Sequence, residues 1–275
     1  MIYIAVIAIS LTLFCIWQNN HIVISNFNYN NKNLPNEFDG FKIVHISDLH
    51  NKLFGKNQEY ILKKINSTSP DIIVVTGDLI DRRRYDLETS LLFIEGAMEI
   101  APIYYVSGNH EAWSGEYENI RKELISQGVV VLDDKKVELI RDKEKIEILG
   151  LTDPAFLTSS YSDKRNTSVL EKHLKIMKDD DIFQILLSHR PDLIDIYSRE
   201  KIDMIFSGHA HGGQVRLPGI GGIVAPDQGF FPKYTSGSHT VENSTMYVSR
   251  GLGNSLVPIR IFNRPEVVVV TLSNK

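Results

Sequence analysis

Short apolar runs rich in Val and Ile recur along this sequence, and they limit its possible folds more than any other feature. Runs without alternation of apolar and polar residues are typical of strands buried on both faces. The runs interpreted as strands are KIVHIS (42–47), DIIVVT (71–76), PIYYVS (102–107), FQILLS (183–188) and DMIFS (203–207). Segments with helical spacing alternate with them: QEYILKKINS, LETSLLFIEGAM, EYENIRKELISQG and VLEKHLKIM. This order predicts an α/β fold with a largely parallel arrangement of strands.

Three further stretches extend this prediction. HIVISNFNY (21–29) alternates apolar and polar residues, as a half-buried strand does. VELIRDKEKIEILGL (137–151) is interpreted as a hairpin that turns at 142–145, and MYVSRG and VVVVTL supply later strands. With 275 residues and 43% apolar content, the chain can bury a sizeable core. We expect one globular domain over residues 20–275, preceded by a membrane anchor over 1–19.

The first 17 residues, MIYIAVIAISLTLFCIW, carry no charged side chain. This length lies at the lower edge of the about 17 to 25 residues that span a bilayer as a helix. A cleaved signal peptide is an alternative, although the stretch has neither a basic start nor a small-residue cleavage site. A buried core helix is another, although it would normally show a polar stripe. We predict a single-pass membrane anchor, whose orientation the charges do not determine because the first basic residue is Lys32.

Composition excludes several kinds of partner and site. The net charge of −4, without a cluster of Lys and Arg interleaved with aromatic residues, gives no sign of a nucleic-acid-binding surface. Cys15 is the only cysteine, so the chain can form neither an intramolecular disulfide nor a zinc–thiolate cluster.

Polar residues of the kinds that bind metals follow the apolar runs at the point where each run stops. They are Asp48 and His50, Asp78, Asn109 and His110, His189, and His209 and His211. Because sites in α/β sheets form at the carboxyl ends of strands, we expect these side chains to converge. Five of the nine histidines belong to this set, whereas His45 lies inside a strand and is interpreted as a core histidine. His21, His173 and His239 are interpreted as surface or packing residues.

The composition of this set predicts its chemistry. Carboxylates, one carboxamide and imidazoles, without a thiolate, suit Mn, Fe, Zn or similar divalent ions. The set contains more ligands than one ion needs. Two ions about 3.5 to 4 Å apart that share a carboxylate would use them. His209 and His211 lie in GHAHGGQ, where an extended chain would direct both imidazoles to one side and each could serve a different ion. Taken alone, this heptapeptide could equally be a turn with two solvated histidines.

Five motifs occur together and in a fixed order: DLH (48–50), GDLIDR (77–82), GNHE (108–111), SHRPD (188–192) and GHAHGGQ (208–214). In this set the sequence resembles the calcineurin-like metallophosphoesterase superfamily, over residues of about 40 to 272. The resemblance implies two packed mixed β-sheets flanked by helices, a four-layer sandwich, here preceded by one transmembrane helix. It also implies hydrolysis of phosphodiester or pyrophosphate bonds by a hydroxide that bridges two divalent ions.

The resemblance assigns each candidate residue a role. Asp48, His50 and His211 would bind one ion, and Asn109, His189 and His209 the other, while Asp78 would bridge both. His110 would be the general acid that protonates the leaving group. The ions would be Mn, Fe, Zn or Mg, with Mn favoured. Arg190 and Arg216 are candidate contacts for substrate phosphate, although surface salt bridges would also account for them.

Within the superfamily, the chain is most similar to the YkuE/YaeI-like branch of bacterial membrane-associated or exported phosphodiesterases. The anchor, FKIVHISDLHN, GHAHGGQVRLPG and NRPE carry this similarity. Protein Ser/Thr phosphatases have a phosphate-binding arginine before GNHE, and this chain has Ser107 and Gly108 in those places. A phosphomonoesterase remains an alternative, as does a non-catalytic metal-binding scaffold, although a scaffold would not need His110.

Several residues near the motifs have two interpretations. Asp81 and Arg82 could orient the ligands or could cap a helix, and Arg83 and Arg84 are typical of a solvated face. The long segment 212–239 contains Phe230, Phe231 and Tyr234 and is interpreted as a functional rim. Because this rim would lie near the bilayer, we expect a phosphodiester in a small molecule or in a lipid or envelope component as substrate. The resemblance places the catalytic domain outside the cytoplasm.

Overall fold

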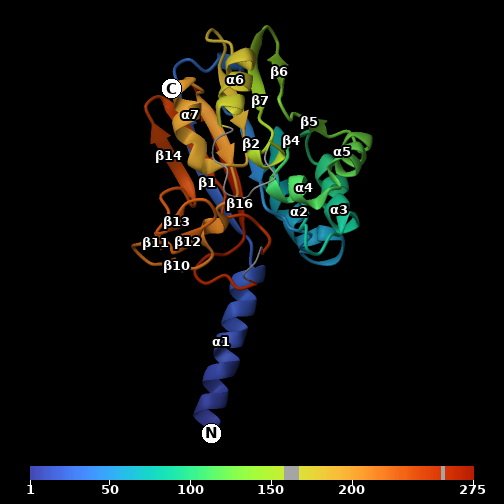
Figure 1. Cartoon of the computed structure of the whole chain (residues 1–275), viewed down its shortest axis with the longest axis vertical. Coiled ribbons are helices and arrows are strands. Elements are labelled where there is room, and N and C mark those ends of the chain that lie inside the picture. The colour runs from blue at the N-terminus through green and yellow to red at the C-terminus, as the bar shows by residue number, and fades with distance from the viewer. Residues whose placement is uncertain (158–166, 255–257) are drawn as a thin grey trace.

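The computed structural model of this protein describes residues 1–157, 167–254 and 258–275. Two six-stranded mixed sheets pack face to face, and helices cover the outer face of each (Figure 1). The predicted α/β fold with two packed mixed sheets is therefore confirmed.

The first sheet has the strand order β1-β16-β2-β3-β4-β5. Its strands are β1 (Val23–Asn30), β16 (Glu266–Ser273), β2 (Lys42–Ile46), β3 (Ile72–Thr76), β4 (Ile103–Val106) and β5 (Val130–Val131). Strands β2 to β5 are parallel, whereas β16 is antiparallel to β2. The parallel block directs the ends of β2, β3 and β4 toward the same edge, and DLH, GDLIDR and GNHE follow those ends.

The second sheet has the order β14-β15-β9-β8-β7-β6. Its strands are β14 (Gly237–Val241), β15 (Ser244–Val248), β9 (Met204–Ser207), β8 (Gln184–Leu187), β7 (Glu144–Gly150) and β6 (Lys135–Arg141). Strands β7, β8, β9 and β15 are parallel, and the predicted hairpin forms β6 and β7. SHRPD follows β8 and GHAHGGQ follows β9, so this sheet supplies the remaining candidate ligands.

The strands are buried on both faces, as their continuous apolar sequences predict. Ile43 of β2 packs between the two sheets together with Phe206 of β9, whereas the next residue, Val44, packs under the helices of the first sheet. Those helices are α2 (Glu59–Asn66), α3 (Leu87–Met98) and α5 (Tyr117–Ser126). The second sheet is covered by α6 (Thr167–Met177) and α7 (Ile194–Arg199). The loops that carry the candidate site residues thus follow strands of a closely packed double-sheet core.

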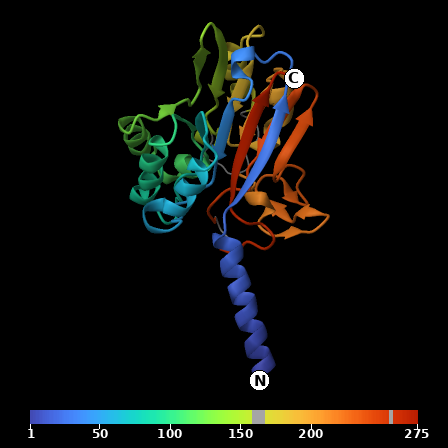
Figure 2. The ribbon, with the colours of Figure 1, turned by 180° about the vertical axis from the view of Figure 1, so that it is seen from behind.

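Helix α1 (Ile2–Asn20) projects from one end of the domain (Figures 1 and 2). Its apolar side chains are exposed along most of its length, which argues against the core-helix alternative. By length and composition it could span a membrane. Its last turns contact the domain: Phe14 packs edge-on against Phe262, with ring centroids 5.6 Å apart, and Gln18 is buried.

Four short strands form two small hairpins at the end of the domain from which α1 leaves (Figures 1 and 2). They are β10 (Arg216–Leu217), β11 (Gly221–Gly222), β12 (Val224–Ala225) and β13 (Gly229–Phe230). The long segment after GHAHGGQ therefore has its own hydrogen-bonded structure, and it exposes Ile220, Phe230 and Phe231.

Candidate active site

The loops after β2 and β3 are joined by backbone hydrogen bonds at the edge of the first sheet. The amide of Asp48 donates to the carbonyl of Gly77 at 3.0 Å, and that of His50 donates to the carbonyl of Asp78 at 3.0 Å. Five candidate ligands have positive φ: Asp48, His50, Asp78, His209 and His211. Such conformations are strained for residues with a side chain, and strain of this kind concentrates at functional sites.

Two glycines allow the motifs to approach one another. A Cβ on Gly108 would lie 2.4 Å from an oxygen of Asp78, and a Cβ on Gly208 would lie 1.8 Å from the hydroxyl of Ser47. Neither position has room for a side chain, so GNHE must meet GDLIDR, and GHAHGGQ must meet the loop after β2, through glycine.

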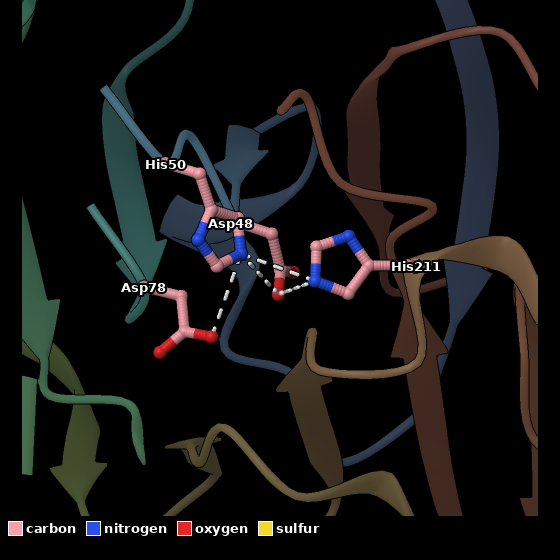
Figure 3. Close-up of side chains that lie close together, drawn as sticks. All are labelled: Asp48, His50, Asp78 and His211. Atoms are coloured by element: carbon pink, nitrogen blue, oxygen red, sulfur yellow. Dashed lines mark hydrogen bonds and ion pairs between the residues drawn. The ribbon is translucent and has the colours of Figure 1, made fainter. Parts of the chain in front are cut away.

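Asp48, His50 and His211 form one half of the site, which we call the His50 half (Figure 3). The Nε2 atoms of His50 and His211 face each other at 3.1 Å. Nε2 of His211 lies 3.3 Å from Oδ1 of Asp48, and Nε2 of His50 lies 3.6 Å from Oδ2 of Asp78. All four side chains are buried, and their potential ligand atoms lie within 4.8 Å of one another.

Asn109, His189 and His209 form the second half, which we call the His189 half. Nε2 of His189 lies 3.2 Å from the amide oxygen of Asn109 and 3.2 Å from Nδ1 of His209. The same nitrogen lies 3.4 Å from Oδ2 of Asp78. Oδ2 of Asp78 thus faces both halves, in the position that a bridging carboxylate would need.

The two halves fit divalent metal ions. Nitrogen and oxygen atoms of ligand type converge in each half, and such a mixed set suits Mn, Fe or Zn. Imidazole nitrogens so close together are poorly accommodated unless a proton or a cation lies between them. A third buried group, His50 with Asp81 and His110, also meets the distance condition and overlaps the His50 half.

The two histidines of GHAHGGQ belong to different halves, although the chain there is not extended. His209 and His211 have φ values of 63° and 47°, so the expectation that an extended chain directs both imidazoles to one side is wrong. The left-handed turn instead presents Nδ1 of His209 to the His189 half and Nε2 of His211 to the His50 half.

Hydrogen bonds fix the orientation of both imidazoles in the His189 half. Nδ1 of His189 lies 2.7 Å from the carbonyl of Thr76, which can only accept, so Nδ1 carries a proton and Nε2 is the nitrogen left for the site. Nε2 of His209 lies 2.8 Å from a carboxylate oxygen of Asp227, which leaves Nδ1 of His209 for the site. Partners of this kind orient metal ligands and raise their basicity.

Comparisons with known proteins agree with this geometry. The family model of calcineurin-like phosphoesterases matches residues 41–213, a stretch that contains every candidate ligand. The chain belongs to this family. It is therefore a metallophosphoesterase, and its buried His and Asp groups are able to hold metal ions.

Similar proteins include two from bacteria. The chain is 32% identical over 248 residues to the uncharacterized metallophosphoesterase YkuE of Bacillus subtilis (strain 168). The aligned region covers 88% of this chain and 82% of YkuE. It is 28% identical over 241 residues to the phosphodiesterase YaeI of Escherichia coli (strain K12), covering 84% and 82% of the two chains. The crystal structure of TT1561 of Thermus thermophilus shares the fold, with a TM-score of 0.54, 13% identity and coverage of 77% and 90%.

Glu111 of this phosphoesterase organises the loops, a role that the sequence analysis did not assign. Its fully buried carboxylate accepts hydrogen bonds from the amides of Asp78 and Leu79, each at 2.8 Å, and from that of Gly108 at 2.7 Å. Burial and the nearby Asp78 raise its pKa to about 7. Its place at the third residue of the short helix α4 (Asn109–Ser114), directly after two site residues, was the only signal in the sequence.

His110 lies at the edge of the His50 half, where its ring contacts that of His50 edge-on with centroids 4.4 Å apart. Its Nδ1 accepts a hydrogen bond from the amide of Arg82 at 3.1 Å, so the neutral ring carries its proton on Nε2. Asp81 is buried with one oxygen 3.5 Å from Nδ1, where its charge favours a protonated ring, and the orienting role of GDLIDR stays a prediction. Burial lowers the pKa of His110, and the carboxylates of Asp78 and Asp81 oppose that shift.

The two halves also differ in electrostatics. Burial lowers the pKa of His50 to about 3 and holds that of His211 well below its usual value. Burial alone would also lower the pKa of His189, but the carboxylate of Asp78 raises it to about 10. Without a metal ion, His50 and His211 are therefore neutral at pH 7, whereas His189 carries a proton that a metal ion would displace.

The two predicted substrate arginines are engaged within the protein. Arg190 is 8% exposed, pairs through two nitrogens with Asp153 at 2.7 and 3.0 Å, and also contacts Asp227. These contacts support a role in positioning Asp227 and His209, and a contact with substrate stays a prediction. Arg216 is half-buried and donates to the carbonyl of Gly212 at 2.8 Å, so its substrate role also stays a prediction. His45 is a core histidine as expected, with Nε2 2.7 Å from the hydroxyl of Thr76.

Proposed function

We propose that this protein is a dinuclear metal-dependent hydrolase of phosphodiester or pyrophosphate bonds, held at a membrane by α1. The observation that carries the proposal is the position of Asp78, which faces both ligand groups while His110 lies beside one of them. A scaffold that only stored metal would need neither a shared carboxylate at the centre nor a histidine with a free Nε2 at the rim.

Each half would hold one ion. Asp48, His50 and His211 would bind the first, Asn109, His189 and His209 the second, and Asp78 would contact both. Two bound divalent ions would supply an activated water nucleophile and would offset the charge that develops at phosphorus. The set is rich in imidazole and carboxylate and lacks thiolate, which suits divalent ions such as Mn, Fe and Zn, and Mn is the metal that we propose among them.

His110 would act as general acid in this reaction. Its Nε2 is the atom that could hydrogen-bond a leaving oxygen, because Nδ1 is bonded to the amide of Arg82. The ring would have to bind a second proton to act as an acid, and the carboxylates of Asp78 and Asp81, which oppose the lowering of its pKa by burial, would favour that imidazolium form. The amide of Arg82 holds the ring in this orientation from one side, and the contact with His50 holds it from the other. The leaving group would therefore depart on the side of the His50 half.

The membrane is the proposed location of substrate as well as enzyme. Exposed apolar side chains gather at the end of the domain that α1 leaves, on the hairpins β10–β13 and around Phe262, which packs on Phe14 of α1. Such a surface could rest on lipid headgroups. We propose a phospholipid-like or envelope phosphodiester as the substrate class and an extracytoplasmic catalytic domain.

Turnover of bis-p-nitrophenyl phosphate by the full chain with added manganese tests the proposed reaction. We expect hydrolysis that a chelator abolishes, at a higher kcat/KM than for the monoester p-nitrophenyl phosphate. The reverse preference would favour the phosphomonoesterase alternative, and no turnover with any divalent ion would favour the scaffold.

The location is tested separately. Residues 1–17 should hold the protein in the membrane fraction, and removing them should leave a soluble, active enzyme that still contains Gln18. Protease added to intact spheroplasts should digest the domain. Full protection until lysis would place the domain in the cytoplasm.

A further inference from the structure

A cavity of about 340 Å³ opens at His50 and extends away from the other metal-ligand candidates, none of which lines it. Its lining includes His50, Asn51, Lys52, Arg84, Asp86 and Asn254. The cavity thus begins at a candidate metal ligand, and it could receive a part of the substrate other than the phosphorus under attack.

The cations of this lining differ in how their charge is balanced. The guanidinium of Arg84 is paired with Asp81 at 2.8 Å, and the carboxylate of Asp86 accepts hydrogen bonds from the amide and hydroxyl of Thr89. Lys52, by contrast, forms no ion pair with a carboxylate among the described residues; its ammonium contacts the carbonyl of Asn19 and lies 4.8 Å from the centre of the Phe54 ring.

A second cation near Lys52 adds to the positive charge. Arg260 is fully buried, and its guanidinium donates to the carbonyls of Arg250 and Gly253 and to the side chain of Asn254, again without an ion pair within the described ranges. Removing cations from water without a counter-charge is costly, and an anion that entered the cavity would offset that cost. The cavity is therefore suited to an anionic group.

Two lining residues of the cavity, Lys52 and Asn254, contact the end of α1. The amide side chain of Asn254 donates to that of Asn19 at 3.1 Å, and Lys52 contacts the backbone of the same residue. Asn19 lies in the last turn of α1. An anionic group in the cavity would thus lie between the metal site and the end of α1.

We propose that this cavity binds a second anionic group of the substrate, such as a phosphate, with Lys52 as its principal donor. The inference rests on the proposed function, because it assumes that a phosphodiester or pyrophosphate is cleaved at the neighbouring metal site. It narrows the substrate class to esters with at least two anionic groups. The second group could belong to a lipid headgroup or to a soluble molecule.

A matched pair of chromogenic substrates tests the subsite. Thymidine 5′-(p-nitrophenyl phosphate) and its 3′-phosphorylated form release the same p-nitrophenolate and differ by one phosphate. With the full chain in neutral phosphatidylcholine nanodiscs and manganese, we expect kcat/KM to be higher for the phosphorylated form by roughly tenfold, the size of one charge-assisted hydrogen bond. Lys52→Met should bring this ratio close to unity, and Lys52→Arg should retain most of it.

The ratio of the two kcat/KM values distinguishes a role of Lys52 in substrate binding from a role in folding. If Lys52 only stabilised the end of α1, Lys52→Met would lower both rates equally and leave the ratio unchanged, which would overturn the inference. Lys56→Met is the control, because Lys56 is exposed, lies four positions along the chain, and does not line the cavity. If the wild type turned over neither substrate, the proposed function itself would fail.

Competition identifies the source of the anionic group. Phosphatidylcholine vesicles containing phosphatidylinositol phosphate are compared with vesicles containing phosphatidylinositol, and soluble inositol bisphosphate is compared with inositol monophosphate. Stronger inhibition by the more phosphorylated lipid, lost in Lys52→Met, would assign the group to a lipid headgroup. The same pattern with only the soluble pair would assign it to a soluble substrate, and inhibition by neither would count against the subsite.

Discussion

The two halves of the site meet at Asp78 but are held in place by different means. In the His189 half, the nitrogens that face away from the site are bonded to the Thr76 carbonyl and the Asp227 carboxylate. In the His50 half, the corresponding Nδ1 atoms of His50 and His211 have no hydrogen-bond partner among the described residues. One half is thus oriented through its side chains, whereas the other depends on the backbone of its loops.

The backbone of the His50 half is in turn connected to α1. The side-chain amide of Asn263 donates to the carbonyl of His211 at 2.7 Å, and the backbone amide of Asn263 donates to the side chain of Gln18 at 3.2 Å. Gln18 lies in α1 and is 4% exposed. The comparison indicates that the His189 half is preorganised within the domain, while the His50 half is positioned partly by α1.

The largest effect should come from the residue that the halves share. Asp78→Asn should lower metal occupancy in both halves and turnover by on the order of 10³ or more, because it removes the charge that both ions need. Elemental analysis and turnover of bis-p-nitrophenyl phosphate measure the two effects, and the exposed Asp180→Asn is the control. Full occupancy of both halves in Asp78→Asn would refute the bridging role.

Replacement of His110, the proposed general acid, should affect substrates with poor leaving groups more than substrates with good ones. His110→Ala should retain its metals but lose on the order of 10² to 10⁴ in turnover of substrates with poor leaving groups. With p-nitrophenolate, which needs little protonation, the loss should be much smaller. An equal loss on both kinds of substrate would reject the assignment of His110 as general acid.

The side-chain support of the His189 half can be removed selectively. Asp227→Ala should weaken the metal bound in that half by about 10- to 100-fold, the usual effect of losing a partner that orients a ligand. The His50 half should keep its affinity, so metal titration should show one weakened and one unchanged site. Asp227→Asn retains an acceptor for His209 and should have a smaller effect; equal weakening of both sites would contradict the comparison.

The two halves should respond differently to pH. Because Asp78 raises the pKa of His189 to about 10, a metal ion must displace a proton there, and affinity should rise about tenfold per pH unit from pH 7 toward 10. The imidazoles of the His50 half are already neutral, but burial raises the pKa of Asp48 to about 6. Affinity there should be flat above pH 7 and fall below about pH 6. Chelator competition across pH measures both, and parallel curves would refute the difference.

The smallest effect should come from the anchor. Gln18→Ala removes one hydrogen bond to Asn263 and should weaken metal in the His50 half by about fivefold, the size of one neutral hydrogen bond. The exposed Thr12→Ala in the same helix is the control. A Gln18→Ala protein with wild-type affinity in both halves would show that α1 does not contribute to the site.

Much of this protein followed from local features of its sequence. The apolar runs predicted strands buried on both faces, and the polar residues at their ends predicted where ligands would gather, because parallel strands bring their carboxyl ends to one edge. The five motifs indicated the family, which the match over residues 41–213 confirms. The assignment of each ligand to an ion stays a prediction that the geometry supports.

Only the tertiary structure decided which distant groups support those ligands. Asp227 orients His209, Glu111 accepts hydrogen bonds from four loop amides, and Gln18 reaches Asn263 across 245 positions of the chain. Even within GHAHGGQ, the sequence could not reveal that left-handed φ values direct His209 and His211 into different halves. Strand-end chemistry is encoded locally, by periodicity and by residue type at fixed positions. Hydrogen bonds between remote segments depend on how two sheets and a helix pack, and no local pattern records that packing.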